Sequence, residues 1–275
     1  MGQARFFPEC YMKAIFAILS ATLLPVCAND PVEIRSPALS WQDSLPLVTD
    51  GRPALVLDTA AEIRLRAYPG PWKEKVPSTE PEIRTQVGGM LGPLSASPCV
   101  GLEIGFLSGE KPTEFTRSIL PAEGVIESVC RAGGAKITRT LLTDKETGAI
   151  FIHLLADKPG ALSFRVSLGI EGAAPPEIRN RREMIIPPDE KTGRPGAHVR
   201  VVPFESDVTP DGSSIIVRGE GEAMILLSHG AESASLGTAF ERLGNRHDPG
   251  HSPSDPIKIW HGVLESRMKS AENSP

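Results

Sequence analysis

The most regular feature of the chain is a series of short segments in which apolar and polar residues alternate. In Ala161–Leu168 (ALSFRVSL) every second residue is apolar, and the residues between are serine or arginine. A period of two puts the apolar side chains on one face of a β-strand, as in an antiparallel sheet with one dry face. Similar segments predict strands at Ala54–Asp58, Glu62–Arg66, Val100–Phe106, Thr113–Leu120, Val125–Arg131, Lys136–Leu142, Ile150–Ala156, Val199–Phe204, Ser214–Arg218 and Ala223–His229.

Turn residues between these segments favour an all-β fold. Gly133-Gly134 and Asp211-Gly212 fall between consecutive strands, where glycine supplies the positive φ of a tight turn. We therefore expect two large antiparallel sheets packed face to face, a β-sandwich of the supersandwich type. Two stretches interrupt the pattern: a loop rich in Pro, Gly and Ser is predicted over Pro69–Pro98, and a long excursion on the rim over Gly172–Gly196.

The end of the chain carries a helical pattern. After Gly230 the sequence is loop-like until Asp255-Pro256, which has the composition of a helix N-cap followed by the first helical position. Apolar residues then recur at the spacing of one helix face, at Ile257, Trp260, Leu264 and Met268. The sequence predicts a sandwich over residues 29–229 and a tail over 230–275. The tail contains a helix over Asp255–Lys269 that docks on the sandwich or on a partner.

The amino terminus has the order of a secretory signal peptide, predicted over residues 1–28. Lys13 precedes twelve mostly apolar residues, 14–25 (AIFAILSATLLP), which small residues follow. A membrane span needs about 20 apolar residues, so this run is too short for one. We predict a start at Met12, cleavage after Ala28, and export to the periplasm or the extracellular space. A lipid anchor on Cys27 is the alternative, although Val26 stands where such a site has Gly, Ala or Ser.

Export changes what the cysteines can do. Cys10 and Cys27 would leave with the signal, so Cys99 and Cys130 would remain in an oxidising compartment, where disulfides persist. These two residues are the disulfide candidate. The alternative is that both are small buried apolar side chains on different strands.

Composition bounds the class of protein without indicating a reaction. Hydrophobic residues make up 40% and charged residues 23%, which is typical of a globular protein. With 29 basic and 34 acidic residues the formal charge is −5, which argues against a nucleic-acid partner.

No motif defines an enzyme by itself. His247 and His251 have a spacing that could bind zinc on a helix, but Pro249 and Gly250 break any helix there. We therefore expect neither a metal nor a cofactor. Ser228-His229 cannot form a nucleophile–base pair directly, because adjacent strand residues point to opposite faces.

Candidate binding residues are more numerous than the sequence can separate. Glycoside hydrolysis needs two carboxylates across a cleft, and no pair stands out among Glu103, Glu110, Glu114, Glu123 and Glu127. The run Arg179–Arg182 could bind an anionic sugar or phosphate, although an exposed loop is the simpler interpretation. Of the tryptophans, Trp72, flanked by Gly70-Pro71 and Lys73, is the best candidate for stacking on a sugar, whereas Trp41 is more typical of a core.

Six stretches resemble a known module. They are Ser40–Leu47 (SWQDSLPL), Gly51–Val56 (GRPALV), Phe115–Arg117 (FTR), Gly133–Arg139 (GGAKITR), Ile150–Phe164 (IFIHLLADKPGALSF) and Asp211–Leu227 (DGSSIIVRGEGEAMILL). Together they resemble the N-terminal β-sandwich domain of glycoside hydrolase family 95, the α-L-fucosidase-like enzymes, over roughly residues 38–229. The chain departs from the family at Val48–Gly51, where the family has Gly-Asn-Gly after its Leu-Pro-Leu. It also departs at Arg66–Gly70, where the family has Asn-Glu and Trp-Ser-Gly.

The resemblance implies a fold more directly than an activity, because its motifs are strands and turns. In that family the acid, and the Asn and Asp residues that activate water, lie in an (α/α)₆ barrel after the sandwich, so no catalytic residue carries over. The resemblance implies an exported, non-catalytic module that contacts carbohydrate or a separate catalytic barrel. The alternatives are the N-terminal part of a truncated or split α-L-fucosidase acting on fucosylated glycans, and a structural envelope protein.

Overall fold

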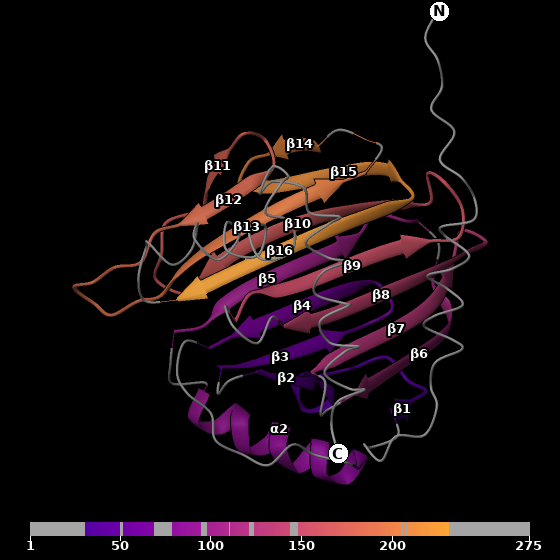
Figure 1. The fold of residues 1–275 in the computed structure, drawn as a ribbon, viewed down its shortest axis with the longest axis horizontal. Coiled ribbons are helices and arrows are strands. Elements are labelled where there is room, and N and C mark those ends of the chain that lie inside the picture. Colours follow the sequence, from indigo (N-terminus) through magenta and orange to yellow (C-terminus); the bar gives the residue numbers. More distant parts are fainter. Residues whose placement is uncertain are drawn as a thin grey trace, which may run out of the picture.

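The computed structural model describes residues 31–49, 52–68, 79–94, 98–109, 111–120, 124–143, 148–204, 206 and 208–230. Within these ranges the chain forms two antiparallel sheets that pack face to face (Figure 1). The main hydrophobic core fills the space between them. The predicted all-β sandwich is confirmed.

The larger sheet has nine strands in the order β1-β6-β7-β8-β9-β16-β13-β12-β11. The meander β6 to β9 occupies one half of it, and β16 pairs with β9 to join the other half. The strands are β1 (Val32–Ile34), β6 (Thr113–Leu120), β7 (Val125–Ala132), β8 (Ala135–Thr143), β9 (Ile150–Ala156), β11 (Glu177–Arg179), β12 (Glu183–Ile186), β13 (Gly196–Pro203) and β16 (Glu222–Gly230).

The smaller sheet has seven strands in the order β14-β15-β10-β5-β4-β3-β2. The chain passes from one sheet to the other several times, so strands that are neighbours within a sheet are often distant in the sequence. The strands are β2 (Leu45–Thr49), β3 (Arg52–Asp58), β4 (Glu62–Ala67), β5 (Val100–Phe106), β10 (Leu162–Ile170), β14 (Val208–Asp211) and β15 (Ser214–Glu220).

The alternation in sequence becomes burial in the structure. Along β10 the residues Leu162, Phe164, Val166 and Leu168 are buried, while Arg165 between them is exposed. The turn between β7 and β8 consists of Gly133 and Gly134, with φ of 59° and 69°. Both angles lie in the left-handed region that glycine adopts without steric cost, so the sequence favours this tight hairpin.

The predicted loop over Pro69–Pro98 is wrong in part, because it contains the helix α2 (Glu80–Leu94). Thr79 precedes the helix and its hydroxyl accepts a hydrogen bond from the Glu82 amide, as an N-cap does. Ile83, Val87 and Met90 are spaced along one helix face and are buried. The Gly and Pro content of the segment hid this periodicity. The helix packs on the 3₁₀ turn η1 (Trp41–Asp43) and on β2.

The excursion predicted over Gly172–Gly196 is also wrong in part. It holds β11 and β12, which pair with each other and extend the nine-stranded sheet beyond β13. The basic run forms the hairpin tip, where Asn180 and Arg181 have φ of 50° and 60°. This segment lacks the alternation of the longer strands because β11 is mostly exposed.

Several predictions fall outside the described residues. They are the signal peptide over 1–28, the candidate Trp72, the pair His247 and His251, and the helix over Asp255–Lys269. Within the described ranges, no helix is both long and apolar enough to cross a membrane.

Candidate functional site

The first candidate is a group of charged side chains buried between the sheets, which we call the inter-sheet cluster: Asp58, Arg117, Ser128 and Arg139. Cross-strand register builds it, because Ser128 on β7 lies opposite both Arg117 on β6 and Arg139 on β8. All three are buried. Ser128 and Arg139 contact Asp58, which ends β3 in the other sheet, and Arg117 acts on it through its charge. A single row across three strands therefore meets one carboxylate from the facing sheet.

Arg139 makes most of the contacts in this cluster. Its guanidinium donates to Asp58 at 2.7 Å and to the carbonyls of Thr59 and Ala60 at 2.8 Å each. It also lies 4.1 Å from the centre of the Phe106 ring, a cation–π contact. Ser128 donates to the second oxygen of Asp58. Both carboxyl oxygens of Asp58 and both terminal nitrogens of Arg139 thus have hydrogen-bond partners inside the protein, whereas the buried Nε of Arg139 has none.

The inter-sheet cluster links the two sheets, and its charged groups are closed off from solvent. Burial raises the pKa of Asp58, and Arg139 and Ser128 oppose that rise by stabilising the carboxylate. Asp58 and Arg139 are at most 1% exposed, so a substrate could not reach them without separating the sheets. Sequence reasoning missed this cluster. A cationic residue at an inward position, as Arg139 is between Ile137 and Leu141, was the available signal.

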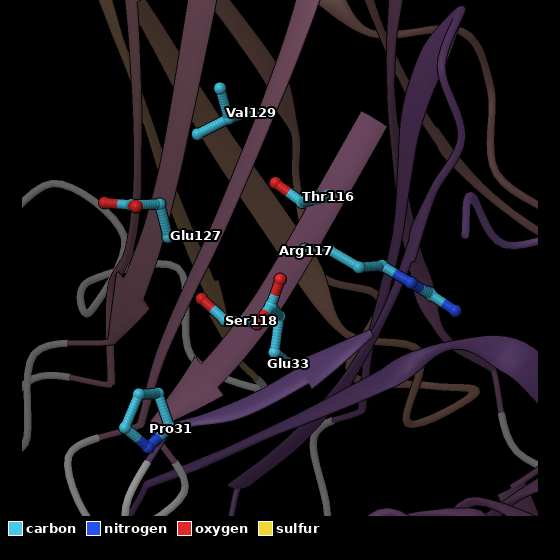
Figure 2. Close-up of a pocket in the computed structure, with 7 residues that line it drawn as sticks. All are labelled: Pro31, Glu33, Thr116, Arg117, Ser118, Glu127 and Val129. Carbon is cyan, nitrogen blue, oxygen red and sulfur yellow. The ribbon is translucent and has the colours of Figure 1, made fainter. Parts of the chain in front are cut away.

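The second candidate is a shallow pocket of about 240 Å³ on the outer surface of β1, β6 and β7 (Figure 2). Register places Glu33, Ser118 and Glu127 in one row across the three strands, and Thr116 beside Val129 in the neighbouring row. Pro31 and the stem of Arg117 complete the lining. The Arg117 guanidinium points away from the pocket, and it donates to the Asp43 carbonyl inside the protein.

Glu127 is the partly buried carboxylate of this pocket. Burial raises the pKa of its carboxyl, and the charge of Lys136 lowers it by less. Among the described residues, Glu127 makes no hydrogen bond or ion pair that the structure shows, whereas Glu33 pairs with Arg35 at 3.1 Å. A half-buried carboxylate without a hydrogen-bond donor, beside two hydroxyls, suits a ligand that itself donates hydroxyl groups. The volume lies below the roughly 300–1,000 Å³ of typical ligand pockets, so a single small ring is the largest fitting group.

The other carboxylates named from the sequence are not gathered at this pocket. Glu103 lies on β5 of the other sheet, 3.7 Å from Arg64, and Glu114 forms an ion pair with Arg131 at 2.7 Å. Glu110 and Glu123 lie outside the described residues. In the basic run, Arg179 pairs with Glu177 on its own strand. Of the three glutamates in this set that the structure describes, Glu127 is the one that lines the pocket.

The remaining sequence candidates have structural surroundings. Trp41 packs at the edge of the core and the Arg66 guanidinium covers its ring at 4.2 Å, so this ring face is not free for a sugar. Ser228 and His229 are adjacent on β16, and both are buried. Glu220, at the end of β15, accepts hydrogen bonds from the amides of Ser206 and Gly221.

Cys99 and Cys130 are free thiols in the structure, and their pairing after export stays a prediction. Cys130 lies inside β7 of the larger sheet, and Cys99 precedes β5 of the smaller one. The Arg139 guanidinium donates to the Cys130 sulfur at 3.5 Å, so this thiol belongs to the surroundings of the inter-sheet cluster. Burial raises the pKa of both thiols, which keeps them protonated and poorly nucleophilic. Across the described part of the chain, no group of His, Cys, Asp and Glu could hold a metal ion.

No family model and no curated protein matches this chain. A solved structure that does match is of a protein described as a kojibiose phosphorylase from the human microbiome, at 10% identity and a TM-score of 0.32. The match covers 63% of this chain and 25% of that chain, so this chain spans about a quarter of its length.

Proposed function

We propose that this protein is an exported, non-catalytic β-sandwich module of a glycan-processing system, and that it contacts carbohydrate through the pocket on β1, β6 and β7. The resemblance of its strand sequences to the N-terminal sandwich of glycoside hydrolase family 95 supports the class of system. The observation that carries the binding role is the Glu127 carboxylate, partly buried in a surface pocket beside Ser118 and Thr116.

The chemistry of the pocket matches a polyhydroxylated ligand. A carboxylate accepts hydrogen bonds from sugar hydroxyls, while the hydroxyls of Ser118 and Thr116 can donate or accept. Val129 and Pro31 add a small apolar surface, against which the carbon face of a sugar ring can pack. The few polar groups would fix the orientation of the ring, as they do in small-molecule sites generally.

The binding role is tested by titrating L-fucose and a fucosylated oligosaccharide into isotope-labelled protein and following amide shifts. We expect saturable shifts confined to β1, β6 and β7, and their loss in Glu127→Gln and in Ser118→Ala. The matched control is Glu103→Gln, which changes an exposed glutamate on the other sheet and should bind like wild type. Shifts that persist unchanged in Glu127→Gln, or that map elsewhere, would reject the pocket as the site.

Export is tested separately. The mature protein should begin at Asn29, because small residues precede the predicted cleavage site after Ala28. Intact-mass measurement of protein recovered from the periplasm or the medium gives the terminus directly. Protein that keeps Met12 at its terminus would contradict the signal peptide while leaving the carbohydrate assay unaffected.

A further inference from the structure

The nine-stranded sheet is dry on both of its faces over its central strands. Along β16, Ala223, Ile225 and Leu227 point into the sandwich core, whereas Met224 and Leu226 alternate with them and face outward. All five are at most 1% exposed. An antiparallel sheet that has water on its outer face normally alternates apolar and polar residues there, and β16 does not.

The outward residues form a second hydrophobic cluster, which we call the outer cluster. Neighbouring strands complete it, since Phe151 lies opposite Leu226 on β9 and Leu142 lies opposite Phe151 on β8. Its members are Leu142, Ala149, Phe151, Met224 and Leu226, with Val125, Val202 and Phe204 packed against them. Its buried members and Val202 therefore span β8, β9, β16 and β13, in the middle of the larger sheet, and Val125 adjoins them from β7 (Figure 1).

A sheet cannot cover its own face, so a further layer must lie over the outer cluster for its side chains to be this dry. The helix α2 is not that layer, because it packs on η1 and on β2 at the edge of the other sheet (Figure 1).

We propose that the outer cluster is the docking surface of the carboxyl-terminal segment Asp255–Lys269. This segment lies outside the described residues, and its sequence predicts a helix with one apolar stripe: Ile257, Trp260, Leu264 and Met268. The chain leaves the sheet at Gly230, the end of β16, which is the central strand of the cluster. The 24 residues between Gly230 and Asp255 are ample to bring the segment back over the same face.

The dimensions of the two surfaces agree. The strands β8 to β13 are separated by three inter-strand spacings of about 4.8 Å, which makes the cluster about 14 Å wide. From Ile257 to Met268 a helix rises about 16 Å, at about 1.5 Å per residue. A helix laid across the strands would thus cover all four with its stripe. A helix of this length is marginally stable in water by itself. Docking would bury the apolar stripe of the helix and, at the same time, shield the outer cluster from water.

The first test uses oxidation of methionine as a measure of cover, on the full-length chain. Met224 belongs to the outer cluster and Met184 to the main core, and both are fully buried. In Leu264→Glu, which places a charge in the stripe, peroxide should oxidise Met224 at least about tenfold faster relative to Met184. In Ser266→Glu, which adds the same charge to the opposite helix face, that ratio should not change. Met224 that stays as protected in Leu264→Glu as in wild type overturns the proposal.

The second test does not depend on the stability of that variant. Leu226→Cys is combined in turn with Ile257→Cys, Trp260→Cys, Leu264→Cys and Met268→Cys, in a chain whose Cys10, Cys27 and Cys99 are changed to serine. At least one combination should form an intramolecular disulfide on mild oxidation, while Leu226→Cys with Ser266→Cys should not. Disulfides that link two copies would show that a second molecule covers the cluster. Protection of Met224 that is lost on deleting residues 1–28 would assign the cover to the amino-terminal apolar run. Either result overturns the proposal.

Discussion

Substitution of Arg139 should lower the free energy of unfolding of this protein more than substitution of an exposed arginine does. Arg139→Met keeps a long apolar stem but deletes the guanidinium that contacts Asp58 and the carbonyls of Thr59 and Ala60. The Asp58 carboxylate, which is fully buried, then has Ser128 as its remaining hydrogen-bond donor. The variant therefore leaves the Asp58 carboxylate inside the sandwich without the guanidinium that contacts it, and the charge of Arg117 acts on it only without a hydrogen bond.

The expected loss can be worked from these contacts. Breaking a buried ion pair by removing one partner costs about 3–5 kcal/mol, because the other charge stays desolvated. The two orphaned carbonyls add to this, at about 1–3 kcal/mol for each acceptor that water cannot reach. A domain has about 5–15 kcal/mol of stability in total, so a loss of at least about 3 kcal/mol is a large share.

The assay is equilibrium unfolding in urea, followed by far-UV circular dichroism. The control is Arg165→Met, which removes an ion pair of similar length, 2.8 Å to Asp211, between partners that are 44% and 49% exposed. That exposed pair should contribute less than about 1 kcal/mol. Asp58→Asn combined with Arg139→Met should be more stable than the sum of the single losses predicts, because the uncompensated charge is gone. Equal losses in Arg139→Met and Arg165→Met would refute the argument from burial.

Three further predictions concern the pocket and the glycines. Burial raises the pKa of Glu127 above its usual 4.5, so the folded chain holds the proton more tightly than the unfolded chain does. The contribution of Glu127 to stability therefore falls as the pH rises from about 4.5 through the raised pKa. Glu127→Gln should therefore be more stable than wild type at about pH 7 and equal to it at about pH 3.5, as measured by urea midpoints; a constant difference would contradict this. Gly196→Ala should lose about 1–3 kcal/mol, because a Cβ would lie 2.6 Å from Pro188, while Gly88→Ala, with open space in α2, should gain about 0.5–1 kcal/mol in the same assay. The purified chain should release no fucose from an aryl α-L-fucoside or an α-1,2-linked oligosaccharide over days. Turnover that follows the protein through gel filtration and vanishes in Glu127→Gln would place a catalytic site in the pocket.

The local elements of the fold could be predicted well from the sequence. The strands β5, β6 and β9 begin and end at the predicted residues, because a period of two and flanking turn residues are properties of the chain within about ten residues. The glycine turn between β7 and β8 was predicted for the same reason. The helix α2 was not predicted, although Thr79 and the spacing of Ile83, Val87 and Met90 are helical signals, because glycine and proline within its sequence are typical of loops.

What the sequence could not determine is which strands share a sheet and which side chains meet across the core. Asp58 and Arg139 are 81 residues apart in the chain, and they meet because β3 and β8 belong to different sheets that face each other. Likewise, the row of Glu33, Ser118 and Glu127 exists only through the register of three strands. Alternation tells which residues share one face of a strand, but pairing and register depend on the summed burial of the whole sandwich. Only the tertiary structure therefore placed Glu127 in the pocket beside Ser118 and placed Arg139 inside the core.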